Sequence, residues 1–266
     1  GLRMGEAVLE FNDVEISYGG IVVVEGVDAQ VRAGEVLCIV GESGSGKSSL
    51  IRAAMGLLGP GGEVSGGRIA YDGRDLVRCS SRELRRLCGS ELAMIFQDCL
   101  SALTPIRTIG VQLAEMARAH GASPREVESR FLDLLESVNI DDPRRVLSSY
   151  PFELSGGMGQ RVGIGMALAM QPKVLFADEP TSALDTVSQR KVVEQLLAFK
   201  EASSCAIVLV THSFGVARAM ADAILVLKEG RAVEAGPTRS VLESPQHPYT
   251  RELLDAVPVL ERRAHD

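Results

Sequence analysis

The residues best suited to chemistry lie in one glycine-rich stretch, residues 41–48, which reads G-E-S-G-S-G-K-S. It matches the phosphate-loop pattern G-x-x-x-x-G-K-[ST], in which glycines let consecutive backbone N–H groups turn toward an anion. Lys47 can reach the β- and γ-phosphates of a nucleotide, and the Ser48 hydroxyl can ligate Mg²⁺. The pattern therefore predicts a nucleoside triphosphate site. The residues we expect to contact the nucleotide here are Gly41, Glu42, Ser43, Gly44, Ser45, Gly46, Lys47, Ser48 and Ser49.

This stretch has on either side the elements that such a site requires. The run V-L-C-I-V at 36–40 is entirely apolar, which is typical of a buried parallel strand. Apolar residues at helical spacing predict a helix over 49–58, whose N-terminus adds partial positive charge near the phosphates. A glycine-rich turn that binds nothing is the alternative, and this context disfavours it.

Composition limits the classes of protein to consider. The net charge of −7 and the pI near 5.3 disfavour a nucleic-acid binder, because such proteins present a basic face. No run approaches the roughly 18 apolar residues of a membrane helix, and no charged and then apolar leader indicates secretion. The 5 cysteines include no C-x-x-C pair, so we expect free thiols in a reducing compartment.

The remaining pattern predicts an α/β chain with a mostly helical insert over residues 98–170. Short apolar runs at 7–18, 21–24 and 27–31 are separated by glycines and predict an antiparallel sheet. The further elements we expect are a connection over 59–67, a strand at 68–73, a capped helix over 80–87, strands at 92–96, 174–177 and 206–210, helices at 109–120, 124–138, 162–170, 186–200 and 216–221, and a strand pair at 223–227 and 231–234.

Several of these strands end in polar residues. Asp178 and Glu179 follow the run 174–177, which we expect to lie beside the strand that feeds the phosphate loop. Asp178 is then placed to help hold Mg²⁺, and Glu179 to act as the general base on an attacking water. Gln97 and His212 also end predicted core strands, on the side where ligands bind in such sheets. A structural hydrogen-bonding role is the alternative for each of these two.

A second helix start, within L-S-G-G-M-G-Q at 154–160, has the features of an anion site. Ser155 can cap the helix, and two flexible glycines follow it. A common helix cap is the alternative. Two such helix starts in one chain suggest that a nucleotide is gripped from two sides.

The ordered set of motifs resembles the nucleotide-binding subunit of an ABC transporter over almost the whole chain. The motifs that carry the resemblance are the phosphate loop, Gln97, the signature at 154–160, V-L-F-A-D-E at 174–179, S-A-L-D at 182–185 and His212. The resemblance implies an α/β P-loop NTPase with a RecA-like core, an antiparallel β subdomain and a helical insert carrying the signature. It further implies a nucleotide-binding domain over 4–236 and a tail over 237–266.

The resemblance also implies an ATPase that uses ATP and Mg²⁺. In such a protein Glu179 activates water, and His212 holds the γ-phosphate and contacts Glu179. Ser48, Gln97 and Asp178 arrange Mg²⁺, and the aromatic ring of Tyr18 stacks on adenine. In this family two domains pack head to tail around two ATP molecules, each contacting the ATP of the other. The residues implied to make that contact are Ser155, Gly156, Gly157, Met158, Gln160 and Asp185.

Y-P-F-E at 150–153 and the tail at 244–258 resemble the ATPases of importers for oligopeptides, dipeptides, nickel or metallophores. The resemblance implies import of peptides, nickel or a metal chelate, at the cytoplasmic face of the membrane. The implied partners are two membrane-spanning permease subunits, a second ATPase subunit that is a paralogue, and an extracytoplasmic solute-binding protein, with no nucleic acid. Cys99, and A-L-T-P at 102–105, depart from the usual Pro and S-L-N-P, which affects the inference of cargo and not the chemistry.

Three other functions remain open at this point. A soluble ABC-type ATPase that acts on nucleic acid or the ribosome usually carries two fused cassettes or a long inserted coiled coil. A small-molecule kinase with a phosphate loop needs an acceptor site and has no signature. An exporter ATPase differs chiefly in lacking the importer-like tail.

Overall fold

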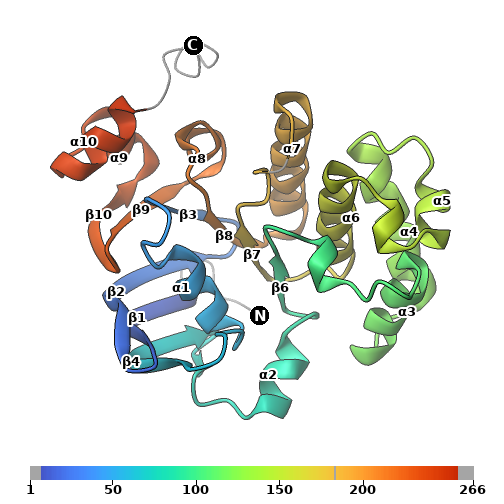
Figure 1. Cartoon of the computed structure of the whole chain (residues 1–266), viewed down its shortest axis with the longest axis horizontal. Coiled ribbons are helices and arrows are strands. Elements are labelled where there is room, and N and C mark those ends of the chain that lie inside the picture. The colour runs from blue at the N-terminus through green and yellow to red at the C-terminus, as the bar shows by residue number, and fades with distance from the viewer. Residues whose placement is uncertain (1–6, 183, 257–266) are drawn as a thin grey trace. The chain divides into compact units, whose positions relative to one another are not determined.

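The structure is a computed structural model that describes residues 7–182 and 184–256 (Figure 1). These divide into two compact parts, which we call the first part (7–84 with 206–256) and the second part (85–205). Residues 4–6 of the predicted domain, 257–266 of the predicted tail and Ala183 of S-A-L-D lie outside the described residues. The predicted domain boundary after residue 236 stays a prediction.

The first part contains the predicted antiparallel sheet, with strand order β2-β1-β4-β5. Its strands are β1 (Ala7–Tyr18), β2 (Ile21–Arg32), β4 (Gly62–Tyr71) and β5 (Arg74–Asp75). The prediction of separate strands at 21–24 and 27–31 is wrong, because β2 runs through both. Gly26 adopts φ +62°, and the β1–β2 pairing shifts register nearby, so the strand absorbs the irregularity without ending. β4 likewise begins inside the stretch expected to be a connection.

The first part also contains parallel strands, as the apolar runs predict. β3 (Val36–Val40) pairs in parallel with β8 (Ala206–Val210) and with β9 (Ala223–Lys228), and β10 (Arg231–Pro237) runs antiparallel to β9. Every residue of β3 and β8 is buried. Since β8 and β9 occupy both edges of β3, the expectation that the strand ending at Asp178 adjoins it is wrong.

The helices of the first part are short. α1 (Lys47–Ala54) begins two residues before the expected start and ends well before residue 58, because Gly56 at φ +64° breaks the helical path. The boundary between the two parts falls within α2 (Ser81–Leu87), whose predicted capping box is confirmed, since Ser80 N donates to Glu83 Oε2 at 2.9 Å and Glu83 N to Ser80 Oγ at 3.3 Å. The other helices are α8 (Phe214–Met220), α9 (Thr238–Glu243) and α10 (Pro248–Asp255).

The second part is mostly helical, as predicted, around one pair of parallel strands, β6 (Leu92–Ile95) and β7 (Val174–Asp178). Its core forms where Val127, Phe131 and Leu135, all fully buried, point from one face of α4 toward α3 and α6. Figure 1 shows α3 to α6 gathered in green and yellow-green. The helices are α3 (Ile109–Ala119), α4 (Pro124–Ser137), α5 (Pro143–Ser148), α6 (Gly156–Ala169) and α7 (Thr186–Ser203), with single 3-10 turns at Leu100–Ala102 and Pro151–Glu153.

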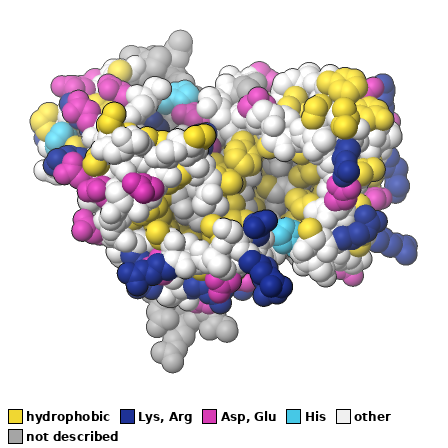
Figure 2. Space-filling model, turned by 60° about the horizontal axis from the view of Figure 1, so that its bottom comes forward, with side chains coloured by type: hydrophobic (Ala, Val, Ile, Leu, Met, Phe, Trp, Pro, Cys, Tyr) yellow, Lys and Arg dark blue, Asp and Glu magenta, His cyan; other side chains and the backbone are white. Residues whose placement is uncertain are grey.

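The surface adds two observations. No helix within the described residues is both long enough and apolar enough to cross a bilayer. Figure 2 draws one face with its lysine and arginine side chains in dark blue.

Candidate functional site

The phosphate loop connects β3 to α1 and has the backbone shape that the sequence predicts. Gly44 and Gly46 adopt φ +81° and +96°, a region that side-chain-bearing residues rarely enter. Gly46 precedes α1, so no side chain caps the helix start, and its first turn contains no acidic residue. The positive end of the helix is therefore left for an external anion, which fits a phosphate group.

Lys47 turns its side chain back into this loop. Its ammonium donates to Gly41 O at 2.9 Å and to Glu42 O at 2.6 Å, and the residue is only 7% exposed. These carbonyls satisfy the hydrogen-bonding needs of a cation that is largely removed from water. The loop and Lys47 together fit a triphosphate.

Segments far away in the sequence support the outer side of the loop. A Cβ on Gly41 would lie 2.2 Å from the carbonyl oxygen of Leu227, at the end of β9. Gly230, in the β9–β10 turn, donates from its N–H to Ser45 O at 3.2 Å. Nothing in the sequence pattern predicted these contacts, because they join segments with no shared motif.

His212 lies at the same edge of the parallel strands as the phosphate loop. Ile39 of β3 pairs with Val210 of β8, and Thr211 N donates to Ile39 O at 3.3 Å. His212 itself is exposed in the turn between β8 and α8. Tyr18 ends β1, and its ring lies against Gly62 of β4, so its adenine-stacking role stays a prediction.

In the second part, Gln97, Asp178 and Glu179 lie at one edge of the β6–β7 pair. Ile95 pairs with Ala177, so the chain segments that follow them leave the strands side by side. Asp178 is 1% exposed, whereas Gln97 is exposed. Glu179 adopts φ +50°, a left-handed conformation that is unfavourable for a non-glycine residue. A strained backbone at the predicted general base is consistent with a functional constraint there.

Gln160 connects the ends of β6 and β7 to α6, the helix that begins within the signature at 154–160. Its side-chain amide donates to Phe96 O at 3.1 Å and to Pro180 O at 3.0 Å, and the residue is 3% exposed. It thus fixes the backbone immediately before Gln97 and immediately after Glu179. Sequence reasoning grouped it with residues that contact a partner's ATP and missed this inward role. The one signal for this role in the sequence was a polar glutamine near the start of an otherwise apolar helix.

The start of α6 is open, as expected for the signature. Ser155 caps the helix by accepting from Met158 N at 3.3 Å, and a Cβ on Gly156 would meet no atom within 4 Å. Asp185 caps α7, accepting from Val187 N and Ser188 N at 3.0 Å each. The hydrogen bonds from Ser188 lower the pKa of Asp185 and keep it ionised.

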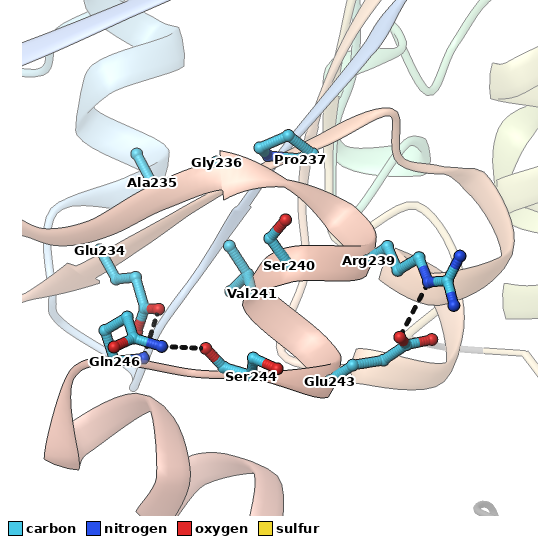
Figure 3. Close-up of a pocket in the computed structure, with 10 residues that line it drawn as sticks. All are labelled: Glu234, Ala235, Gly236, Pro237, Arg239, Ser240, Val241, Glu243, Ser244 and Gln246. Atoms are coloured by element: carbon cyan, nitrogen blue, oxygen red, sulfur yellow. Dashed lines mark hydrogen bonds and ion pairs between the residues drawn. The ribbon is translucent and has the colours of Figure 1, made fainter.

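The structure therefore brings together two sets of predicted residues, each within one part. The first part contains the phosphate loop with Lys47, Ser48 and His212, and the second part contains Gln97, Asp178, Glu179 and the signature residues. A pocket of about 600 Å³ lies elsewhere, between β10 and α9, and none of the predicted site residues lines it (Figure 3).

Comparison with known proteins identifies the family. The family model described as "ABC transporter" matches residues 24–182, more than half of the chain. The chain belongs to the ABC transporter family. A second model, "Oligopeptide/dipeptide transporter, C-terminal region", matches residues 233–266 of this ABC protein. The resemblance stated from the motifs is confirmed.

Relatives and solved structures agree with this assignment. The ABC chain is 44% identical over 236 residues to the dipeptide transport ATP-binding protein DppD of Escherichia coli, covering 88% of this chain and 72% of that protein. It is 41% identical over 259 residues to the oligopeptide transport ATP-binding protein OppD of Salmonella typhimurium, covering 96% and 77%.

Among solved structures, the ATP-binding cassette MJ0796, in a dimeric post-hydrolysis state bound to ADP and Pi, superposes with a TM-score of 0.77 at 27% identity, covering 87% of this chain and 99% of that chain. The predicted fold class, a P-loop ABC ATPase fold, is confirmed, and the chain is an ATPase of the ABC type.

Proposed function

We propose that this chain is the ATP-hydrolysing subunit that powers a peptide importer. The match of its C-terminal region to the oligopeptide and dipeptide transporter family carries this proposal. The two relatives described above are named for dipeptide and oligopeptide transport, which favours peptides over nickel or a metal chelate as cargo.

In this proposal the first part binds the nucleotide. Lys47 exchanges its loop carbonyls for β- and γ-phosphate oxygens, and the loop amides surround the phosphates. Tyr18 stacks on adenine. His212, exposed at the end of β8, contacts the γ-phosphate and Glu179.

The residues proposed for Mg²⁺ are Ser48, Gln97 and Asp178, which supply the hydroxyl, amide and carboxylate oxygens that this ion prefers. The ion, when bound, neutralises charge that develops on the phosphate oxygens. The buried position of Asp178 suits a carboxylate held in one orientation for this purpose.

Glu179 is proposed to accept the proton of the attacking water. The rest of the chemistry is positioning and charge stabilisation, because phosphoryl transfer needs little covalent participation by the protein. Gln160 holds the backbone next to Glu179 and also next to Gln97, as its two hydrogen bonds to Pro180 O and Phe96 O indicate.

We infer that the open signature helix serves a second subunit. Ser155, Gly156, Gly157 and Met158, together with Asp185, would contact ATP bound by a partner ATPase, a paralogue, packed head to tail. The proposed system adds two membrane-spanning permease subunits and an extracytoplasmic solute-binding protein, with this chain at the cytoplasmic face of the membrane.

A pull-down of this chain from gently solubilised membranes tests the proposal. We expect two multi-span permease subunits and a second ATPase to co-purify, with the associated binding protein retaining peptides. Recovery of ribosomes or nucleic acid without membrane proteins would leave only the ATPase chemistry standing. Recovery of an exporter, in which the ATPase is fused to its own membrane domain, would indicate transport in the opposite direction.

A further inference from the structure

The C-terminal tail touches the phosphate loop through one side chain. Glu42 N–H donates to the hydroxyl oxygen of Tyr249 at 3.0 Å, across 207 positions of sequence. Tyr249 is 4% exposed, so the acceptor side of the contact is buried, whereas Glu42 is exposed. The Q-H-P-Y-T stretch at 246–250 served above only to assign a subfamily, yet it places a polar atom against the proposed nucleotide site.

The position of Tyr249 is fixed from several directions. It lies in the first turn of α10, whose cap His247 accepts from Tyr249 N at its Nδ1 atom, 3.2 Å away. Glu234 of β10 accepts from Gln246 N at 2.8 Å and from His247 N at 3.0 Å, and Figure 3 shows the first of these bonds. The ammonium of Lys228 lies 4.7 Å from the centre of the Tyr249 ring, a cation–π distance.

Burial raises the pKa of Tyr249, so the hydroxyl stays neutral at physiological pH. A neutral hydroxyl accepts a hydrogen bond from Glu42 without placing a negative charge beside the phosphate site. The contact is therefore compatible with a triphosphate in the loop.

Glu42 transmits this contact to the lysine. Its N–H faces Tyr249, while its carbonyl oxygen accepts from Lys47 Nζ at 2.6 Å. When phosphate oxygens become the acceptors of Lys47 Nζ, the hydrogen bond from Lys47 to Glu42 O is released. The hydrogen bond from Glu42 N to the Tyr249 hydroxyl can remain. The loop then keeps its shape although the lysine has moved, and less conformational entropy is lost on binding.

We propose that Tyr249 is a positioning residue that braces the phosphate loop, so that the C-terminal tail sets the affinity of the chain for ATP. This inference rests on the proposed function of the loop. It adds that an otherwise peripheral segment acts on nucleotide binding through Glu42.

The test is the Tyr249→Phe variant of the full chain, which loses only the hydroxyl. Because the bond to Tyr249 remains when ATP binds, its loss acts through the ordering of the loop, and we expect the Kd and the KM for ATP to rise about five- to thirtyfold, the entropy of ordering about one loop residue, with kcat nearly unchanged. Tyr71→Phe is the matched control, because Tyr71 is also 4% exposed but lies on β4, where it pairs with β1 and β5. Its Kd for ATP should equal that of the unchanged chain.

A second variant, Glu234→Gln, weakens the anchor of α10 without altering Tyr249. It should raise the Kd for ATP in the same direction, and the double variant should add little to Tyr249→Phe alone. An unchanged Kd in Tyr249→Phe, or an equal rise in Tyr71→Phe, would overturn the inference while leaving the proposed function intact. Failure of the unchanged chain to bind ATP would instead overturn the proposed function.

Discussion

Replacing Gln160 with leucine should separate the arrangement of the catalytic groups from nucleotide binding. The leucine keeps the volume of the buried side chain but cannot donate to Phe96 O or Pro180 O. The backbone before Gln97 and after Glu179 then loses the side chain that joins both to α6. We expect kcat to fall while the Kd for ATP stays the same, because the phosphate loop belongs to the first part.

The size of the effect follows from the two hydrogen bonds. A buried carbonyl left without its donor costs about 1–3 kcal/mol, and Phe96 O retains a contact from Cys99 Sγ at 3.3 Å. The free energy of unfolding should therefore fall by about 2–4 kcal/mol. A displacement of reacting groups by about 1 Å lowers turnover by about 10²-fold, so kcat should drop to that extent.

Gln195 offers a matched control in the same part of the chain. It is 7% exposed, and its amide donates to Leu134 O at 2.8 Å and to Ser137 Oγ at 3.0 Å, away from the predicted catalytic residues. Gln195→Leu should cost less stability than Gln160→Leu in urea denaturation, because Ser137 Oγ still donates to Leu134 O at 2.7 Å, and it should leave kcat intact. Equal kcat values for the two variants, at a temperature where both are folded, would refute the reasoning.

Other consequences can be measured with the same preparations. Glu179→Gln should lower phosphate release by about 10²–10⁴-fold without changing the Kd for ATP, and undiminished hydrolysis would remove Glu179 as the general base. Gly41→Ala should weaken ATP binding more than Gly44→Ala, because its Cβ would lie 2.2 Å from a β9 carbonyl, whereas at Gly44 it would meet nothing within 4 Å; equal binding would contradict this. Burial raises the pKa of Cys99 to about 12, so iodoacetamide at pH 8 should label Cys79 first, with the Cys99 rate rising about tenfold per pH unit; early Cys99 labelling in peptide mass spectra would show that it is not buried.

The sequence predicted those elements whose apolar pattern is set by burial. The strand at 36–40 and the strand at 206–210 match β3 and β8 residue for residue, because both are buried throughout. The sequence pattern failed at glycines, because a glycine can lie within a strand or end an element. Gly26 was interpreted as a strand break but lies within β2, whereas Gly56 does end α1. The local sequence cannot say whether a positive φ forms a bulge or a helix end, because pairing with another strand decides it.

The candidate site was predictable wherever one motif makes its own local geometry. The phosphate loop, the Ser155 cap and the polar residues after β6 and β7 are of this kind. The contacts of Gln160 and Tyr249 were not predictable, since each joins a side chain to backbone atoms at least 20 positions away, and a motif does not say which distant segment it meets. The expectation that the Asp178 strand adjoins β3 failed for a related reason, because strand order depends on connections that apolar patterns do not encode.

These long-range contacts share one physical purpose. A loop that binds phosphate must expose backbone N–H groups and use glycine, which makes it intrinsically mobile. The chain compensates by holding the outer side of the loop with groups from other elements: Gly230 N–H on Ser45 O and the Tyr249 hydroxyl on Glu42 N–H. The second part does the same at Glu179, whose unfavourable φ of +50° persists beside the Gln160 hydrogen bond to Pro180 O. In both parts the groups proposed for the chemistry follow from a motif, and the long-range contacts that hold them in place follow only from the fold. Variants of the buried residues should therefore change affinity or turnover without touching any group that contacts ATP.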